Sequence, residues 1–299
     1  MSILLLFCLL RALAAPIQDR PAVLYDDLGH SFSLGAPPRR IVSMAPNITE
    51  ILFALGLGER VVGVTRYCDY PPEAARKDKI GGLVDPSIEK IQALHPDLII
   101  AFRGNPIGIL NKLKNLHFPV FILDTGRSLD DLFLTIEKVA AVTGKEKAAA
   151  NIIDSLRKKR LNIQKTLGPV EKTPRVFLSV YGRGLWTCGQ ESYLNSLLTE
   201  DKGVNIAGGI RRRWLNLSRE ELIHRDPEVI IIMTGDESGF TQAKQWLLAD
   251  SRLKTISAIQ RHRIYFLDEN VASRFGPRLI DAFDDVARIL HPEKFAMHL

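Results

Sequence analysis

The sequence SIEKIQALHPDLIIAF, residues 87–102, decides the fold because the chain contains a second version of it. Aligned without a gap, residues 218–233 read SREELIHRDPEVIIIM. Both versions begin with Ser, carry Glu at the third position and Pro at the tenth, and end in an apolar run. This internal match predicts two structural units that are built on one plan.

Each version predicts a helix, a turn and a buried strand. Ser87 and Ser218 can each accept a backbone N–H at the start of a helix, and Ser218 with Glu221 has the spacing of a capping box. The Pro ends the helix, and a continuous apolar run is typical of a parallel strand covered on both faces. We therefore expect buried strands at residues 98–101 and 229–232.

The same alternation of short apolar runs and helical patterns continues through the chain, which is typical of parallel sheets with helices outside. The further strands are expected at residues 41–44, 61–64, 120–123, 176–180 and 264–267, after a hairpin at residues 23–34. The further helices are expected at residues 49–55, 129–142, 191–198, 243–248 and 277–290, and residues 203–209 are expected to form a loop. The predicted fold class is α/β, with two similar lobes that have central, mainly parallel sheets.

One segment interrupts this rhythm. Residues 145–167 contain no Gly or Pro and become rich in Lys and Arg towards their end, which predicts one long helix with basic residues at its negative pole. By position this helix joins the lobes, and because a helix is stiffer than a loop we expect little lobe motion. The expected organisation is an N-terminal lobe at residues 22–144, the connecting helix at 145–167 and a C-terminal lobe at 168–299.

Length and composition agree with two lobes. A chain of 299 residues can form two domains of ordinary size, each with its own core. The chain is 46% hydrophobic and 25% charged, as is typical of soluble globular proteins. Its net charge of +6 is modest and its basic residues are spread out, so nucleic acid is not an expected partner.

The N-terminus predicts export. Residues 3–10 are strongly apolar but too few to span a bilayer, and Ala12-Leu13-Ala14 has the pattern of a cleavage site before Ala15. We expect a signal peptide at residues 1–14 and no lipid anchor, because Phe7 before Cys8 is bulky. The two remaining cysteines, Cys68 and Cys188, are expected to be unpaired thiols.

Motifs that would indicate an enzyme are missing from the sequence. It has no GxxxxGK[ST] loop, no GxGxxG after a strand and no GxSxG elbow. The seven histidines show no paired metal-ligand spacing, and His95 and His224 precede buried strands, where a structural role is expected. We expect no catalytic residues and no metal site.

Large flat side chains follow several predicted strands. Ligands of open α/β sheets bind beyond the carboxyl ends of the strands. Several aromatic residues at this edge of two facing lobes predict a cleft for a large, flat, partly apolar ligand. The residues at these positions are Tyr67, Phe102 with Arg103, Trp186 and residues 270–274, with Trp214 just before the second repeat.

The run RRIVSMAPN at residues 39–47, with Thr49, Glu50 and Gly63-Val64-Thr65, resembles the periplasmic binding proteins of iron-chelate and cobalamin ABC importers. The resemblance covers nearly all of the chain from residue 23. Residues 67–74, 100–104 and 274–278, with Trp214 ahead of residues 218–220, look like the cobalamin carriers in particular. The resemblance implies a class III periplasmic-binding-protein fold, in which two lobes joined by a rigid helix hold the corrinoid between them.

The resemblance also implies site residues. Tyr67 sits where the carriers place a Tyr against the corrin, and Phe102 stands in place of their usual Trp. Leu83 replaces an aromatic residue, and residues 270–274 match a closing loop in which Val271 and Ala272 are smaller than usual. The implied ligand-binding set is Tyr67, Leu83, Phe102, Arg103, Trp186, Trp214, Asn270, Val271, Ala272, Ser273 and Arg274.

Glu89 and Glu220 occupy equivalent positions in the two versions of the repeat. In the family, the corresponding pair docks onto arginines of the membrane permease, and one Glu in each lobe suits a two-fold permease. The alternative is that each Glu only stabilises the helix dipole. The implied partners are therefore a corrinoid and an ABC permease dimer in the inner membrane, with cobalamin as transported ligand and not as cofactor.

Three functions can be compared with the sequence. The first is a periplasmic protein that captures a corrinoid and delivers it to an import permease. The second is a carrier of haem, with Tyr67 as axial ligand, or of a ferric siderophore, held by Arg66, Arg103 and Arg274. The third is a corrinoid-modifying enzyme, which needs a nucleophile–base pair or metal set that the sequence lacks.

Overall fold

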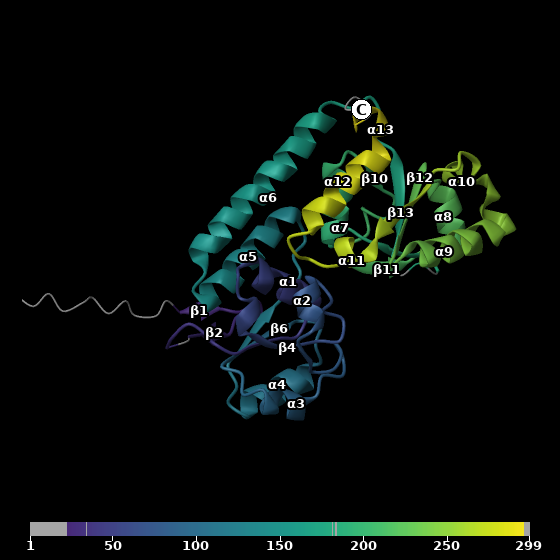
Figure 1. The fold of residues 1–299 in the computed structure, drawn as a ribbon. Coiled ribbons are helices and arrows are strands. Elements are labelled where there is room, and N and C mark those ends of the chain that lie inside the picture. Colours follow the sequence, from purple (N-terminus) through teal and green to yellow (C-terminus); the bar gives the residue numbers. More distant parts are fainter. Residues whose placement is uncertain (1–22, 34, 181, 183, 296–299) are drawn as a thin grey trace, which may run out of the picture.

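A computed structural model describes residues 23–33, 35–180, 182 and 184–295. The expected signal peptide at residues 1–14 lies outside the described residues. The described chain forms two α/β lobes, and the long helix α6 (Glu146–Leu167) runs along one side from one lobe to the other (Figure 1). The expected fold class is confirmed.

The N-terminal lobe is built on a five-stranded parallel sheet with the strand order β5-β4-β3-β6-β7. A short antiparallel hairpin, β1 (Leu24–Tyr25) and β2 (Ser31–Phe32), precedes it as expected. The sheet strands are β3 (Ile41–Ser43), β4 (Val61–Val64), β5 (Asp78–Lys79), β6 (Leu98–Phe102) and β7 (Val120–Leu123). The helices are α1 (Pro46–Ala54), η1 (Gly58–Arg60), α2 (Pro72–Ala75), α3 (Ile88–Ala93), α4 (Ile107–Asn115) and α5 (Leu129–Thr143).

The C-terminal lobe has a four-stranded parallel sheet with the order β10-β8-β12-β13 and a two-stranded antiparallel sheet of β9 and β11. The strands are β8 (Arg175–Ser179), β9 (Trp186–Cys188), β10 (Val204–Asn205), β11 (Trp214–Asn216), β12 (Val229–Thr234) and β13 (Ile264–Asp268). The helices are α7 (Tyr193–Glu200), α8 (Arg219–Arg225), α9 (Glu237–Ala249), η2 (Ser251–Thr255), α10 (Ser257–Gln260), α11 (Glu269–Ala272), α12 (Leu279–Leu290) and α13 (Pro292–Phe295).

The two versions of the repeat occupy equivalent places in the lobes. Ser87 Oγ accepts a hydrogen bond from Lys90 N at 3.2 Å, and Ser218 Oγ accepts one from Glu221 N at 3.1 Å within a capping box. The strands that follow, β6 and β12, each lie beside the first sheet strand of their own lobe, β3 and β8. The inference of two lobes on one plan is thus confirmed by strand position as well as by sequence.

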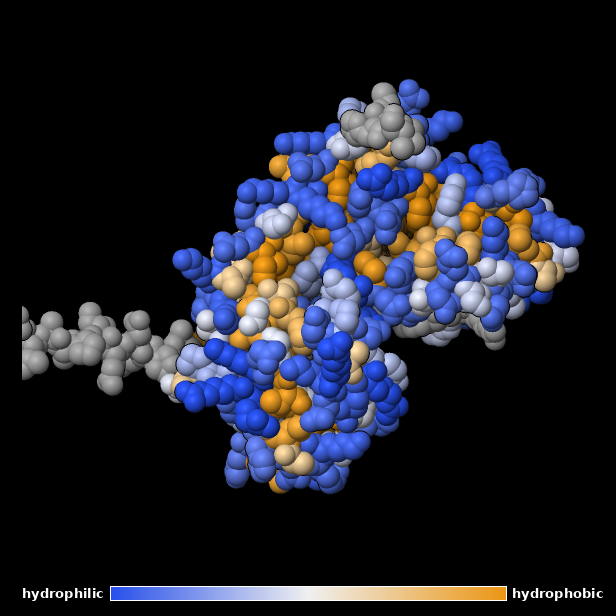
Figure 2. All heavy atoms as spheres, in the orientation of Figure 1, coloured by the Kyte–Doolittle hydropathy of each residue, from blue (hydrophilic) through white to orange (hydrophobic). Residues whose placement is uncertain are grey.

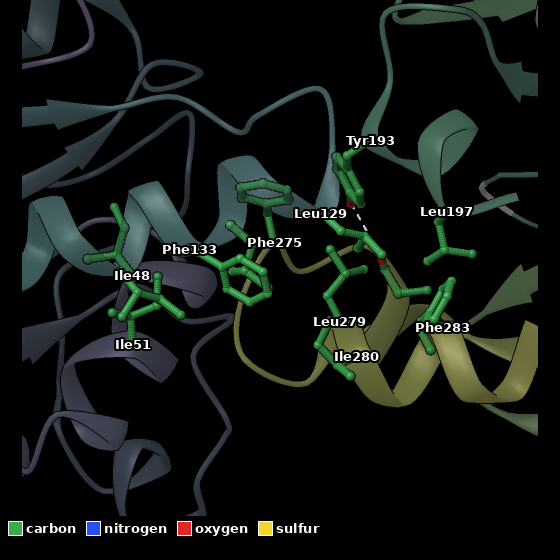
Figure 3. Close-up of a cluster of buried hydrophobic side chains, with 14 of the residues drawn as sticks. Ile48, Ile51, Leu129, Phe133, Tyr193, Leu197, Phe275, Leu279, Ile280 and Phe283 are labelled. Carbon is green, nitrogen blue, oxygen red and sulfur yellow. Dashed lines mark hydrogen bonds between the residues drawn. The ribbon is translucent and has the colours of Figure 1, made fainter. Parts of the chain in front are cut away.

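The lobes do not have fully separate cores, contrary to expectation. Each lobe has one apolar cluster of its own, but the largest cluster is continuous across the junction. Figure 3 shows Ile48 and Phe133 of the N-terminal lobe in the same cluster as Phe275 and Phe283 of the C-terminal lobe. Separating the lobes would expose this apolar surface to water, at a cost of about 25 cal/mol per Å².

Helix α6 adds to this junction. Its buried residues Ala149, Ile153 and Ile163 belong to the shared core. Arg160 on this helix pairs with Asp130 of α5 at 2.6 Å and with Glu200 of α7 at 2.7 Å, so that one guanidinium contacts both lobes. Gly168, with φ +53°, ends the helix at the predicted position.

Several local expectations need correction. Helix α4 was not predicted, and α9 begins at Glu237, well before residue 243, because Asp236 Oδ1 accepts a hydrogen bond from Gly239 N at 2.7 Å. The predicted loop at residues 203–209 contains the short strand β10. Cys68 and Cys188 are both buried free thiols, as expected.

The surface is indented where the two lobes meet. In the space-filling view the exposed face is mostly hydrophilic, with apolar side chains in scattered patches (Figure 2). No helix in the described part of the chain is long and apolar enough to cross a membrane.

Candidate functional site

A cavity of about 290 Å³ lies between the lobes, at the carboxyl ends of the parallel strands. Each of the five strands of the N-terminal sheet contributes to its wall. These residues are Ala45, Pro46 and Asn47 after β3, Tyr67 after β4, Leu83 after β5, Phe102 at the end of β6 and Thr125 after β7. The residues that follow β13 close the other side, and they are Glu269, Asn270, Ser273, Arg274 and Phe275.

Strand order explains this position. In the N-terminal sheet β3 is central, with β4 on one side and β6 on the other, so the connections leave in opposite directions and the loops diverge above it. Ligands of open α/β sheets bind in the crevice that forms at such a point. The cavity is therefore where this topology favours a binding site.

Asn105 fixes the loops around the cavity, and sequence analysis did not single it out. Its Oδ1 accepts a hydrogen bond from Phe102 N at 2.8 Å, and its Nδ2 donates to Leu83 O at 2.9 Å and to Met44 O at 3.3 Å. This buried amide thus connects the ends of three strands. An Asn shortly after a strand is a common turn signal, but its long-range partners are visible only in the structure.

Six of the implied ligand-binding residues come together in the cavity wall. They are Tyr67, Leu83, Phe102, Asn270, Ser273 and Arg274. Arg103 lies in the wall of an adjoining polar cavity instead. The structure thus brings together residues from the loops of both lobes that the sequence placed at strand ends.

The other implied residues lie outside the cavity wall. Trp186 on β9 is 42% exposed, and Trp214 packs on the shared core from the paired strand β11. Val271 also packs against the core. The side chain of Ala272 is fully buried because α11 turns it inwards, and its carbonyl accepts a hydrogen bond from Tyr193 Oη at 3.0 Å.

The charged rim of the cavity is built around Arg274. Its guanidinium pairs with Asp69 and with Glu50 Oε1, the latter at 3.4 Å, and donates to Asn270 Oδ1 at 3.1 Å. Burial lowers the pKa of Arg274, but its ion pairs outweigh burial and the pKa is raised. The same hydrogen bond from Arg274 lowers the pKa of Asp69, so both groups are charged at neutral pH.

All three arginines proposed for an anionic siderophore already have carboxylate partners. Arg66 pairs with Asp85, Arg103 pairs with Asp124 at 3.0 Å, and Arg274 pairs as described above. The wall of this cavity therefore presents aromatic and aliphatic surfaces, and Arg274, the arginine that lines it, is paired with carboxylates.

Two polar groups of the wall lack a strong partner within the protein. Asn47 is 6% exposed, and its Nδ2 has no hydrogen-bond partner among the residues that the structure describes. Burial raises the pKa of Glu269, with a further contribution from the neighbouring charge of Asp268, which favours its neutral form. The wall thus offers an amide donor and a carboxyl group that can donate when protonated.

Glu89 and Glu220 lie on the first turns of α3 and α8 and are exposed. The pKa of each carboxyl group is lowered, first by its own backbone N–H and then by the hydroxyl of the capping Ser87 or Ser218. Both carboxylates are therefore charged and open to a cationic partner, which is what docking on a permease would require.

Histidines and acidic residues form no metal centre in the described ranges, where no group of three possible ligands comes together. His95, with φ +44°, occupies the turn after α3, and His224 lies in the last turn of α8. These positions agree with the structural role expected for both residues.

The chain is similar to known proteins over most of its length. A family model described as "Periplasmic binding protein" matches residues 41–271. A substrate-binding lipoprotein of an uncharacterized Bacillus subtilis ABC transporter is 27% identical over 92% of this chain and 87% of its own length. The vitamin B12-binding protein of Vibrio cholerae is 30% identical over 85% of this chain and 90% of its own length.

Among solved structures, the periplasmic heme-binding protein from Roseiflexus sp. RS-1 superimposes with a TM-score of 0.77 at 27% identity, covering 86% of this chain and 99% of that one. Two of these relatives are named for the substrates that they bind. Because their names include both vitamin B12 and heme, similarity alone does not select a ligand.

Proposed function

This chain belongs to the periplasmic binding protein family of ABC importers, and we propose that it captures a corrinoid between its lobes and delivers it to an import permease after export from the cytoplasm. The observation that carries the proposal is the wall of the central cavity. Tyr67, Leu83 and Phe102 give it broad apolar surfaces, and Arg274 in its wall is paired with the carboxylates of Glu50 and Asp69. Such a wall suits a large flat ligand with amide side chains, and a corrinoid has this chemistry.

Polar groups of the wall support the same ligand. The unpartnered Asn47 amide can donate to a ligand carbonyl, and a buried donor that gains a partner on binding adds to affinity. A corrinoid is larger than a cavity of about 290 Å³, and the adjoining polar cavity of about 350 Å³, which shares Thr125, provides further space.

Haem is the second candidate. The Tyr67 side chain is 48% exposed at the cavity, so its phenol oxygen is open to an axial ligand position on iron. The similarity to a periplasmic heme-binding protein adds to this alternative.

Calorimetric titration of the purified protein with cyanocobalamin, haemin and a ferric siderophore, in parallel, tests the proposal. We expect one-to-one binding of cyanocobalamin and much weaker binding of the other two. Binding of haemin or the siderophore alone would overturn the corrinoid assignment and leave the family assignment intact.

A further inference from the structure

A second cavity, of about 350 Å³, adjoins the first and shares Thr125 with it. Its wall is more polar than the wall of the first cavity. Arg103 and Arg127 come from the N-terminal lobe, and Arg213 reaches it from the C-terminal lobe. A ligand that filled the first cavity would therefore lie beside a basic cavity to which both lobes of the protein contribute arginines.

The arrangement around Asp124 leaves positive charge uncompensated. Arg103 Nη1 donates to Asp124 Oδ2 at 3.0 Å, and Arg213 Nη1 donates to Asp124 Oδ1 at 3.1 Å. One carboxylate thus serves two guanidinium groups, whose positive charges exceed its own by one. Because the side chains of Asp124 and Arg213 are only 18% and 29% exposed, solvent screens this surplus less than it would at an open surface.

The remaining acids of this cavity do not remove the surplus. Asp27 pairs with Lys138, and Asp131 Oδ2 accepts hydrogen bonds from the backbone N–H groups of Arg127 and Ser128. Arg127 is exposed and has no carboxylate partner within the described ranges. Four basic and three acidic side chains thus line this cavity, a surplus of one positive charge. Arg213 also donates to Thr125 Oγ1 at 3.1 Å and to Thr125 O at 3.3 Å, so a bound anion would share this guanidinium with Asp124 and Thr125.

We propose that the polar cavity is a subsite for one anionic oxygen group carried by the flat ligand, held by Arg213 and Arg103 across the two lobes. The inference rests on the proposed function. Guanidinium groups match the geometry of both phosphate and carboxylate oxygens. The group is thus either the phosphodiester of the nucleotide tail of a complete corrinoid or a carboxylate of haem.

This subsite gives the lobes a role in specificity. A corrinoid that lacks the nucleotide tail would fill the apolar cavity but leave the arginines on Asp124. A complete corrinoid would engage them, and because Arg213 and Arg103 belong to different lobes, the anion would also connect the lobes. The protein should therefore prefer the complete corrinoid.

The test compares cyanocobalamin with dicyanocobinamide, a corrinoid without the nucleotide and its phosphodiester. Arg213→Gln and Arg103→Gln should each weaken cyanocobalamin binding about tenfold, which is about 1.4 kcal/mol and near the lower range for a hydrogen bond to a charged group. Cobinamide binding should not change. Arg211→Gln removes the same charge from an exposed neighbour outside the cavity wall and should affect neither ligand.

Equal losses for both corrinoids would overturn the subsite and assign Arg213 to lobe packing alone. If Arg213→Gln does not fold, Arg103→Gln decides the test, with a selective loss of cyanocobalamin binding supporting the subsite and no selective loss overturning it. If the wild-type protein binds neither corrinoid, the proposed ligand is wrong, and haemin against its dimethyl ester then tests the subsite separately. In that case Arg213→Gln should weaken the binding of haemin but not of its dimethyl ester, which would support the subsite. Equal changes in affinity for haemin and its dimethyl ester would overturn it.

Discussion

Arg278 joins the two lobes by donating to both carboxylate oxygens of Glu50, from Nη2 at 2.6 Å and from Nε at 3.1 Å, across 228 positions of the sequence. The Glu50 side chain is 2% exposed, and Arg274 is its second ion-pair partner. The Arg278 guanidinium also stacks on Tyr70, 3.7 Å from the ring centroid. The pair therefore lies in the junction itself, beside the cavity and the shared core.

Glu50→Gln should destabilise the protein by about 3 kcal/mol, because removing one partner of a buried ion pair leaves the other charges without compensation. This value lies in the lower part of the range for removing one partner of a buried ion pair. The loss is limited because Arg274 still pairs with Asp69 and Arg278 still donates to the carbonyl of Asn270. Urea unfolding measures the change. Glu59→Gln, at an exposed site of the same lobe, should change stability by less than about 0.5 kcal/mol, and equal effects of the two substitutions would contradict this view of the junction.

Reversing the charge at both repeat positions, Glu89→Lys with Glu220→Lys, should abolish ligand uptake in cells and leave ligand binding by the purified protein unchanged. Both carboxylates are exposed and charged, and neither lines the cavity. Uptake of labelled ligand and calorimetry measure the two effects separately.

The matched control for docking is Glu146→Lys with Glu237→Lys, which also reverses first-turn glutamates but at positions outside the repeat. These substitutions remove the same kind of interaction with the helix dipole. They leave Glu89 and Glu220 in place, so uptake should persist if those two residues dock on the permease. Loss of uptake in the control as well, or loss of ligand binding in the Glu89 and Glu220 variant, would make the repeat glutamates structural.

Asp201 should make stability depend on pH. Its side chain is fully buried, and neither carboxylate oxygen has a hydrogen-bond partner among the residues described. Burial, and then the charges of Glu200 and Asp284, raise its pKa well above the ordinary value. The folded state therefore favours the protonated form, so the contribution to stability is fully present below about pH 4, the ordinary pKa of Asp, and declines as the pH rises towards the folded pKa.

Asp201→Asn removes this ionisation. We expect the variant to be more stable than the wild type at pH 8, with the advantage shrinking as the pH falls from the folded pKa towards about 4, the ordinary pKa of Asp. Urea unfolding at several pH values gives the comparison, and Asp78→Asn at an exposed position should show no such trend. An advantage of the same size at pH 4 and pH 8 would show that ionisation of Asp201 is not its cause.

The sequence predicted those parts of the fold that local chemistry determines. The Ser caps, the Pro after each repeat helix and the apolar runs of β6 and β12 all lie within a few residues of one another, and each was found as expected. Helix α4 was missed because Pro106 and Gly108 obscure its beginning. The shared core and the Glu50–Arg278 pair depend on residues far apart in the chain, which no local pattern encodes.

The same distinction applies to the site. Tyr67 and Phe102 follow strands of the main sheet, so the rule that ligands bind at the carboxyl ends of strands placed them correctly at the cavity. Trp186 and Trp214 belong to β9 and β11, which pair with each other in a separate sheet, and they lie outside its wall. A short strand of this kind has no periodicity that would reveal its partner.

Corrinoid binding in the cavity can be measured by titrating the wild type, Phe102→Ala and Trp246→Ala with cyanocobalamin. Phe102 lies in the cavity wall, whereas Trp246 is an exposed aromatic residue on α9 outside it. Removing an aromatic contact of this kind should cost about 1.4 kcal/mol or more. We expect one-to-one binding by the wild type, affinity at least about tenfold weaker for Phe102→Ala, and no change for Trp246→Ala. Failure of the wild type to bind cyanocobalamin, or equal affinity of all three proteins, would contradict corrinoid binding in this cavity.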